Sequence, residues 1–383
     1  MGQDKMSLGH MTVIIGAMIG MLIGSGIASG AETIQYYTYH GYWGLAVGTC
    51  LCIIISLCFI AFAYAGRTRG LSDIGQIYTF YCGKYLGAFF SAISGFFVFA
   101  CYMFMTSGFG STLEQQFGIP LWIGCGISTL LVLYVTITGF KSLVDIIGRV
   151  APVMIVLIFA IGIMAAFKYF PHIDEGIHLI ESGQVQVNHI SEHWYMSCLS
   201  VSGCAICLVA AFLGVLGYEN RNYDFRSFAF CLVVAAIVNC GTNVLMGFNN
   251  LGNIERASQV PIPNLVLATS LLPSSWGTAL GIVFAILILC AIFTTVCPAM
   301  WTTVQWFSKD EKSTKYKITA IAIAVIVYIV CLFVPYQTLI LVLMKWSGYC
   351  GVLIWVVCIP RYFIIRARDK REGRGITASL ETH

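Results

Sequence analysis

Hydrophobic residues run through this chain in long blocks and not in the alternation typical of a half-buried strand. Each block holds few charged residues and has about the 20-residue length that an α-helix needs to cross a lipid bilayer. The period-2 alternation of a membrane β-barrel strand is absent from the sequence. We therefore predict an all-α integral membrane protein with ten transmembrane helices. The predicted spans are 11–38, 43–66, 85–110, 119–140, 143–169, 194–219, 225–249, 275–307, 317–334 and 337–365.

The composition agrees with this prediction and excludes several classes of protein. Of the 383 residues, 58% are apolar and 10% are charged, and the mean hydropathy is +0.85. A soluble domain carries roughly 25% charged residues, so a water-soluble enzyme, a disordered chain and a nucleic-acid-binding chain are excluded. The expected partner is the lipid bilayer, and no nucleic acid is expected.

The cysteines do not point to a disulfide framework or to a zinc site. Most of the 16 lie inside the apolar blocks, where thiols behave as small hydrophobic groups. Cys204 and Cys207 form a C-x-x-C pair, but neither a second pair nor a nearby histidine completes four zinc ligands. We expect no organic cofactor.

The basic residues predict how the chain crosses the membrane. With the N-terminus on the cytoplasmic side, all but three of the 21 Lys and Arg residues fall in cytoplasmic segments, as the positive-inside rule requires. The exceptions are Lys168, Arg256 and Lys345. Both termini are therefore expected to be cytoplasmic. The first apolar block is too long for the core of a signal peptide, so we expect it to be retained as a span.

Three segments outside the predicted spans differ from them in composition. The loop 170–193 is acidic and rich in histidine, and it is predicted on the outer face. The segment 250–274 holds three prolines around an apolar stretch that is too short to span, so we predict an outer hairpin. Residues 367–383 form a basic cytoplasmic tail.

The first predicted span contains a run of small residues that disfavours a continuous helix. Residues 24–30 read Gly-Ser-Gly-Ile-Ala-Ser-Gly, and each interior glycine costs about 0.5–1 kcal/mol relative to alanine. Backbone without hydrogen bonds is tolerated in a membrane only where it lines a protein cavity, so a break here predicts a binding site. The alternative is close helix packing through the same small residues.

A second candidate break lies five spans later. Residues 197–204 read Ser-Cys-Leu-Ser-Val-Ser-Gly-Cys in the sixth predicted span. Paired interruptions at corresponding positions in two halves indicate the binding site of an inverted-repeat transporter. We therefore predict a first five-helix repeat over 1–170 and a second over 171–366.

Glu32 is the only acidic residue deep inside a predicted span, and intramembrane carboxylates are functional candidates. It could bind a ligand or an ion, or carry a coupling proton. An ionised Glu32 would repel a substrate carboxylate and favour an amine or another cation. The structural alternative, compatible with these roles, is a capping box in which Ser29 and Glu32 restart the helix after the break.

Residues 24–37 carry a resemblance to a known family. They read GSGIASGAETIQYY, which resembles the GAGFASGQEILQFF signature of the YkvI-type bacterial membrane proteins in the amino acid–polyamine–organocation superfamily. Ile27 replaces an aromatic residue of that signature, and Ala31 replaces a glutamine. The resemblance implies a bacterial cytoplasmic membrane and the LeuT-like fold, a 5+5 inverted repeat in which helices 1 and 6 are unwound around a central substrate.

The resemblance also implies site residues. In sodium-coupled members of this fold the ion lies between the first-span break and the eighth span, which here implies Gly20, Ile23, Ala291, Thr294 and Thr295. Proton-driven relatives carry a lysine within the fifth span, whereas Lys168 lies only at its outer end. This favours sodium and leaves protons as the alternative. The implied substrate-binding residues are Gly24, Ser25, Gly26, Ile27, Ala28, Ser29, Gly30, Glu32, Tyr102, Ser197, Ser200, Ser202 and Gly203.

Together these patterns predict a secondary active transporter that moves a small amino acid or related amine by alternating access, coupled to sodium or protons. A ligand sensor or channel on the same fold is the alternative. An intramembrane enzyme is not expected, because no predicted span holds a deep histidine and Glu32 has no second buried carboxylate.

Overall fold

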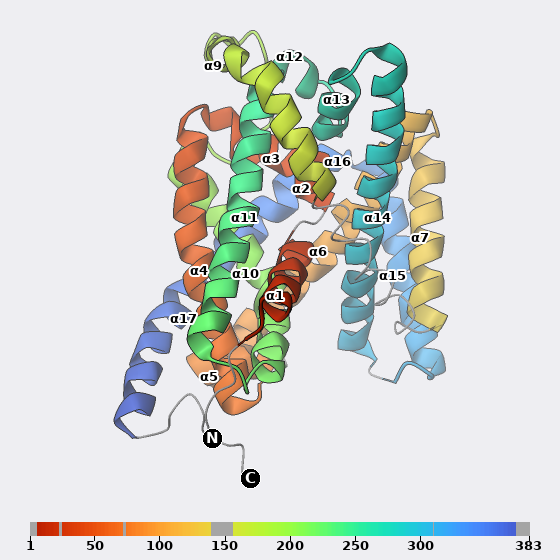
Figure 1. Ribbon diagram of the computed structural model, residues 1–383. Coiled ribbons are helices and arrows are strands. Elements are labelled where there is room, and N and C mark those ends of the chain that lie inside the picture. Colours follow the sequence, from red (N-terminus) through yellow and green to blue (C-terminus); the bar gives the residue numbers. More distant parts are fainter. Residues whose placement is uncertain (1–5, 23–24, 72–73, 139–155, 309, 373–383) are drawn as a thin grey trace.

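The computed structural model describes residues 6–22, 25–71, 74–138, 156–308 and 310–372, and its regular elements are helices (Figure 1). In chain order they are α1 (Leu8–Leu22), α2 (Ser25–Ser29), α3 (Ala31–Tyr36), η1 (Thr38–His40), α4 (Trp43–Arg69), α5 (Ile74–Cys82), α6 (Lys84–Phe117), α7 (Leu121–Thr138), a helix over 156–169, η2 (Phe170–His172), α9 (Ile173–Glu181), α10 (Trp194–Glu219), α11 (Phe225–Leu251), α12 (Ile254–Ala257), α13 (Pro263–Ser270), α14 (Ser274–Phe307), α15 (Thr314–Phe333), α16 (Tyr336–Leu339), η3 (Ile340–Met344) and α17 (Lys345–Arg371).

Where they are described, the predicted spans fall largely on these helices, and residues 143–155 of the fifth predicted span lie outside the described residues. Among the described residues, nine helices are long and apolar enough to cross a membrane, counting Val156–Glu181 and Tyr336–Arg371 as one each. The first predicted span is divided among α1, α2 and α3, and α1 is a shorter apolar helix of 15 residues. Length and composition identify nine candidate spans among the described residues. The tenth transmembrane helix therefore stays a prediction.

The interruption predicted in the sixth span is not seen, because α10 runs as one α-helix from Trp194 to Glu219. Its small residues serve close helix packing instead. A Cβ placed on Gly203 would lie 1.9 Å from the carbonyl oxygen of Gly348 in α17. Serine and glycine suit an unwound segment and a tight helix contact equally well, so composition alone could not distinguish them.

The irregular turn lies in the tenth span. Residues Ile340–Met344 form the π-helix η3, which continues directly into α17. The carbonyl group of Met344 at its end faces α10, where the thiol of Cys204 lies 3.2 Å from the carbonyl oxygen. Single π-helical turns inside longer helices are frequent at functional sites.

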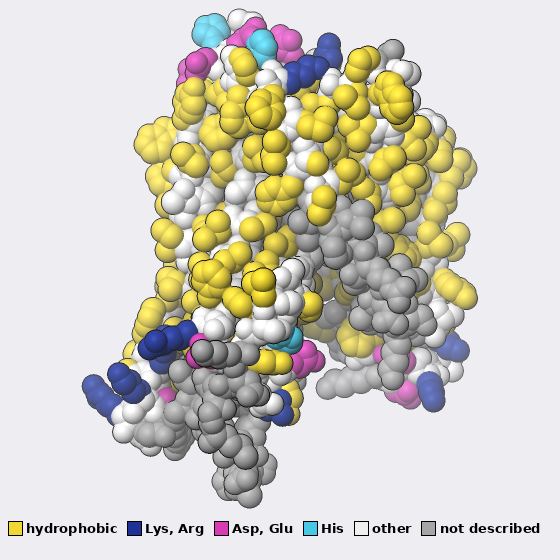
Figure 2. Space-filling view, in the orientation of Figure 1, with side chains coloured by type: hydrophobic (Ala, Val, Ile, Leu, Met, Phe, Trp, Pro, Cys, Tyr) yellow, Lys and Arg dark blue, Asp and Glu magenta, His cyan; other side chains and the backbone are white. Residues whose placement is uncertain are grey.

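The surface has the zoning of a membrane protein. Figure 2 shows a broad hydrophobic belt between two ends where the charged side chains gather. The α9 end carries acidic and histidine side chains with α12 and α13 beside it (Figure 1), and the opposite end, with α5 and the close of α17, is rich in Lys and Arg. We refer to these as the α9 end and the α5 end. Which end faces the cytoplasm remains a prediction.

Long helices surround the interrupted first span. α10 packs against α4 and α17, α14 packs against α6, and α1 packs against α11. α2 contacts α6, α13 and α14, while α3 contacts α10 and α11. The short helix α5, which the sequence did not predict, packs against α6. The first span is therefore enclosed by elements from both halves of the chain.

Candidate functional site

The first span is interrupted at Gly30. Gly30 has φ 86 and separates α2 from α3, a left-handed conformation that glycine adopts at no steric cost. A Cβ there would also lie 2.4 Å from Oδ1 of Asn264. Both the dihedral angle and the close approach therefore require glycine. Ile23 and Gly24, where the sequence also predicted irregular backbone, lie outside the described residues.

Glu32 folds back across this interruption onto α2. A Cβ placed on Gly26 would lie 1.5 Å from Oε1 and 1.7 Å from Cδ of Glu32, so the carboxylate occupies the space that a side chain at 26 would fill. Glu32 is partly exposed. It forms no hydrogen bond or ion pair with any residue the structure describes. Within the described part of the chain, Glu32 is thus a carboxylate without a hydrogen-bonding partner at the predicted binding site.

The capping box predicted from Ser29 and Glu32 is not formed. The Ser29 hydroxyl donates to the carbonyl of Gly26 at 3.1 Å and accepts the backbone N–H of Ala31 at 3.2 Å. A capping box would instead join Ser29 to the N–H of Glu32. Because Gly30 turns the chain, Ser29 reaches a nearer donor and the Glu32 side chain is left for the site.

Tyr336, which sequence reasoning missed, closes one side of the interruption. Its hydroxyl lies 3.0 Å from Oγ of Ser29, and its ring lies over Gly108 of α6, 2.8 Å from where a Cβ would stand. Tyr336 begins α16 directly after Pro335. A tyrosine after a proline is too common in sequences to have identified this contact.

The predicted residues of α10 divide into two pairs. Ser200 accepts or donates a hydrogen bond with the hydroxyl of Tyr36 in α3 at 3.2 Å, and Ser197 bonds Nε2 of His40 at 2.9 Å. Ser202 accepts from the indole N–H of Trp355 at 3.1 Å, and Gly203 packs on α17. The first pair therefore contacts α3 and η1, and the second pair faces α17. Ser200 also lies against α17, where its hydroxyl donates to the carbonyl of Lys345 at 3.4 Å. Their contact with a substrate remains a prediction.

Three histidines lie together beside Ser197 at the α9 end. His189 stacks on Tyr39 with ring centroids 3.8 Å apart, and His193 stacks on Tyr195 at 5.3 Å. Burial, with the nearby His189 and His193, lowers the pKa of His40 to about 4. His40 is therefore a neutral hydrogen-bonding group near pH 7.

Tyr102 of α6 presents an unused polar atom. Its side chain is fully buried, and within the part of the chain that the structure describes its hydroxyl has no hydrogen-bond partner. Buried hydroxyl groups without partners are uncommon. Tyr102 can therefore bind a polar group of a ligand, which stays a prediction.

The predicted sodium ligands of α14 come together around one carbonyl group. The hydroxyls of Thr294 and Thr295 donate to the carbonyl oxygen of Ala291 at 2.8 and 3.0 Å. α14 contacts α2, and Gly20 lies on α1, while Ile23 lies outside the described residues. The three oxygens form a neutral, oxygen-only group of the kind that hard cations prefer.

Side-chain contacts join segments that are distant in sequence at both ends of the molecule. At the α9 end, Asn188 donates to Oε1 of Gln337 at 3.1 Å, and Gln337 donates to the carbonyl of Val260 at 2.8 Å. At the α5 end, Arg69 pairs with Asp369 at 2.7 Å, joining α4 to α17.

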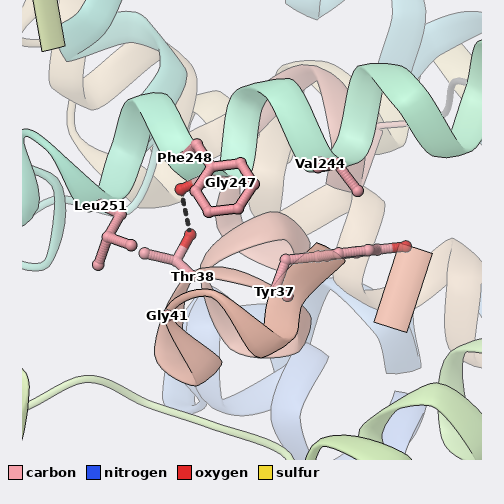
Figure 3. A pocket seen from close by; sticks show the side chains of 8 residues that line it. Tyr37, Thr38, Gly41, Val244, Gly247, Phe248 and Leu251 are labelled. Atoms are coloured by element: carbon pink, nitrogen blue, oxygen red, sulfur yellow. Dashed lines mark hydrogen bonds between the residues drawn. The ribbon is translucent and has the colours of Figure 1, made fainter. Parts of the chain in front are cut away.

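Two shallow pockets lie beside α3. One lies between the end of the first span and α11, where the Thr38 hydroxyl donates to the carbonyl of Gly247 at 3.0 Å (Figure 3). The other lies toward the α9 end. Its lining residues are Ala31, Ile34, Gln35, Val187, Asn188, Ser258, Pro263 and Gln337.

Comparison with known proteins identifies the fold. No protein-family model and no curated protein matches the chain. Among solved structures, MhsT in complex with L-phenylalanine is 12% identical with a TM-score of 0.55, covering 96% of this chain and 99% of that one. A mutant of the Eremococcus coleocola manganese transporter is 14% identical with a TM-score of 0.56, covering 99% and 91%. The same transporter with an aromatic bis-isothiourea substituted compound is 12% identical with a TM-score of 0.58, covering 99% and 84%.

These matches show that the chain has a LeuT-like fold, as the sequence resemblance implied. They extend over nearly the whole chain. At 12–14% identity they show the fold alone, so they assign no substrate and no coupling ion. The membership in the YkvI-type family remains an expectation from the 14-residue segment 24–37.

Proposed function

We propose that this protein is a secondary active transporter of the bacterial cytoplasmic membrane, which moves a small amine or amino acid by alternating access. The observation that carries the proposal is the Glu32 carboxylate, which lies against Gly26 at the interruption of the first span and has no partner among the described residues. The LeuT-like fold supports it, because the similar structures are of proteins named as transporters or bound to an amino acid.

The chemistry of Glu32 favours a substrate with a positive charge. An ionised carboxylate inside a membrane is costly unless a charge or a polar partner compensates it. A substrate ammonium group would supply that charge, whereas the carboxylate of an amino acid would be repelled by it. Within the proposed class, amines and amino acids with an accessible amino group are therefore the expected substrates.

A divalent metal ion is the less favoured cargo, although one similar structure is of a manganese transporter. Among the described residues, no three His, Cys, Asp or Glu side chains are grouped so as to hold a metal ion. Glu32 alone offers one carboxylate, whereas Mn²⁺ sites commonly draw on several oxygen or imidazole ligands.

Sodium is the proposed coupling ion. The carbonyl of Ala291 and the hydroxyls of Thr294 and Thr295 supply neutral oxygens on a helix that contacts α2. An ion shared with the predicted first-span ligands Gly20 and Ile23 would hold the first span against α14. Protons are the alternative, with Glu32 as the proton carrier.

The similar solved structures favour a transporter over a channel, because two of them are of a protein named as a transporter. The contact of Gln337 at the α9 end and that of Arg69 with Asp369 at the α5 end would open during transport. A transporter opens these ends in alternation, while a channel opens both together. A ligand sensor would keep both closed after binding, and this is the second candidate function.

Uptake into proteoliposomes tests the proposal. The purified protein would be reconstituted with a sodium gradient, a proton gradient or neither, and offered labelled alanine, ethanolamine, putrescine and γ-aminobutyrate. We expect concentrative uptake of an amine under one imposed gradient, and competition by unlabelled amines but not by neutral isosteres. Tight binding without flux would support the sensor, and uptake unaffected by any gradient would contradict ion coupling.

A further inference from the structure

A buried amide from α13 lies directly on the interrupted first span. Nδ2 of Asn264 donates to the carbonyl oxygens of Ile27 and Ala28, at 2.9 and 3.3 Å. Both carbonyls belong to α2, just before Gly30 turns the chain. Carbonyl groups at the end of a helix have no partner within it. Asn264 therefore supplies the donors that α2 lacks.

The carboxamide oxygen of Asn264 also forms a hydrogen bond. Oδ1 of Asn264 accepts from Nδ2 of Asn250 in α11 at 3.0 Å, and both side chains are fully buried. Oδ1 also lies 2.4 Å from where a Cβ on Gly30 would stand. The Asn264 carboxamide fits only when residue 30 has no side chain. Its position therefore depends on the glycine at the interruption.

The segment that precedes Asn264 is hydrogen-bonded to α6 and α16. Gln115 of α6 forms two hydrogen bonds with the backbone of Ile262: its Nε2 donates to the carbonyl at 3.0 Å, and its Oε1 accepts the N–H at 2.9 Å. Gln337 of α16 donates to the carbonyl of Val260. The segment 260–264 therefore connects α6 and α16 to α2.

The bonded carbonyls adjoin the residue on which Glu32 lies. Gly26 immediately precedes Ile27, and Glu32 follows Gly30 by two residues. A displacement of Ile27 and Ala28 would shift the surface that supports the Glu32 carboxylate. The position of α13 and the position of this carboxylate are thus linked through one side chain.

We propose that Asn264 is a positioning residue of the substrate site, whose carboxamide fixes the end of α2 beneath Glu32 and couples that position to the segment 260–264. This inference rests on the proposed function, because it treats Glu32 as the group that binds the amine. Asn264 acts through α2 and does not itself touch the substrate.

Hydrogen–deuterium exchange of the full-length protein tests the coupling without requiring transport. Asn264→Ala removes all three hydrogen bonds, and Asn264→Asp replaces the two donors to α2 by a carboxylate oxygen that repels the carbonyls of Ile27 and Ala28. The matched control is Asn249→Ala, which removes an equally buried amide that donates to the carbonyl of Gly162 at 2.8 Å. We expect both Asn264 variants to speed exchange by about tenfold in peptides covering 25–36 as well as 254–270. The control should leave the exchange rate of peptides covering 25–36 unchanged.

Uptake kinetics supply a second measurement on the same variants. For the amine of the panel that the unaltered protein transports fastest, we expect Asn264→Asp to raise KM by roughly tenfold, the loss expected for hydrogen bonds of ordinary strength. The maximal rate should change less than KM. A role confined to the folding of α13 would lower the amount of active protein and leave KM unchanged.

Unchanged exchange over 25–36 in both Asn264 variants would overturn the inference, whatever the uptake result. Should Asn264→Ala fail to fold, Asn264→Asp and Asn250→Ala keep the test in place, and Asn250→Ala is expected to give the smaller effect because the donors to α2 remain. If no protein, altered or not, transports any amine, the proposed function fails while the exchange data still decide the coupling.

Discussion

The carboxylate of Glu32 rests on the backbone of Gly26, 1.5 Å from the place where a Cβ at 26 would stand. The two residues lie on opposite sides of Gly30, so the contact exists only because the chain turns there. Glycine at 26 makes the room, and the turn brings the carboxylate into it. This contact gives the proposed amine site its charge.

Removing that charge should impair transport. We expect Glu32→Gln to lower amine uptake at subsaturating concentration by at least about tenfold, because loss of one member of a desolvated charge pair costs several kcal/mol. Initial rates in proteoliposomes provide the measurement. Glu114→Gln, at an exposed carboxylate near the end of α6, is the control and should leave the rate unchanged. Equal rates for Glu32→Gln and the unaltered protein would contradict the assignment.

Filling the space beneath the carboxylate should have a related effect. Gly26→Ala places a methyl group where Oε1 and Cδ of Glu32 now lie, and the flexible side chain can turn away without unfolding the protein. We expect an unchanged thermal midpoint with amine KM raised by roughly tenfold, since the displaced charge no longer faces the substrate. A fall in the midpoint with an unchanged KM would mean that Gly26 serves packing alone.

The sodium assignment predicts a specific shift in ion dependence. Thr295→Ala removes one of the oxygens grouped at Ala291, so we expect the sodium concentration for half-maximal uptake to rise by about tenfold. Thr303→Ala is matched, because Thr303 donates to the carbonyl of Ala299 in the same helix at 2.7 Å. The control should retain the original sodium response. An identical response in both variants would remove Thr295 from the ion site.

The pKa of His40 predicts how stability depends on pH. The folded protein holds this pKa at about 4, below the value near 6.5 of an unfolded chain. The unfolded state therefore takes up a proton first, and the free energy of unfolding should decrease as pH falls from about 6.5 toward about 4. Thermal midpoints in detergent between pH 4 and 8 should lose part of this slope in His40→Gln. Parallel curves for the two proteins would contradict the prediction.

The continuous course of α10 can be tested through its packing. Gly203→Ala places a Cβ 1.9 Å from the carbonyl oxygen of Gly348, and we expect a loss of about 1–3 kcal/mol in stability, as for other overpacked contacts. Gly241→Ala in α11 meets nothing within 4 Å and should not lower the thermal midpoint. Tolerance of alanine at 203 would indicate that α10 and α17 do not approach as described.

The sequence predicted the spans well because a membrane imposes its requirement on each stretch of chain separately. The predicted span 194–219 coincides with α10, and 275–307 differs from α14 by one residue at its start. The same composition misled in the sixth span, where Ser200 and Gly203 serve contact with α17. Small residues indicate that another group lies close to the backbone. They do not show whether that group belongs to a helix or to a ligand.

The residues of the site also divide into those that the sequence identified and those that it did not. Glu32 and Gly30 were recognisable because a carboxylate or a cluster of glycines is unusual in an apolar block. Asn264 and Tyr336 were not, since each lies in an ordinary local context and acts on a segment more than 200 residues earlier in the chain.

The sequence by itself determined the helical membrane class, most of the spans and the place where the first of them is interrupted, because hydrophobicity and backbone freedom are properties of consecutive residues. The tertiary structure decided which polar groups complete that interruption and where the Glu32 carboxylate lies. Hydrogen bonds extend only about 3 Å, so their partners are fixed by how the helices pack and not by neighbours in sequence.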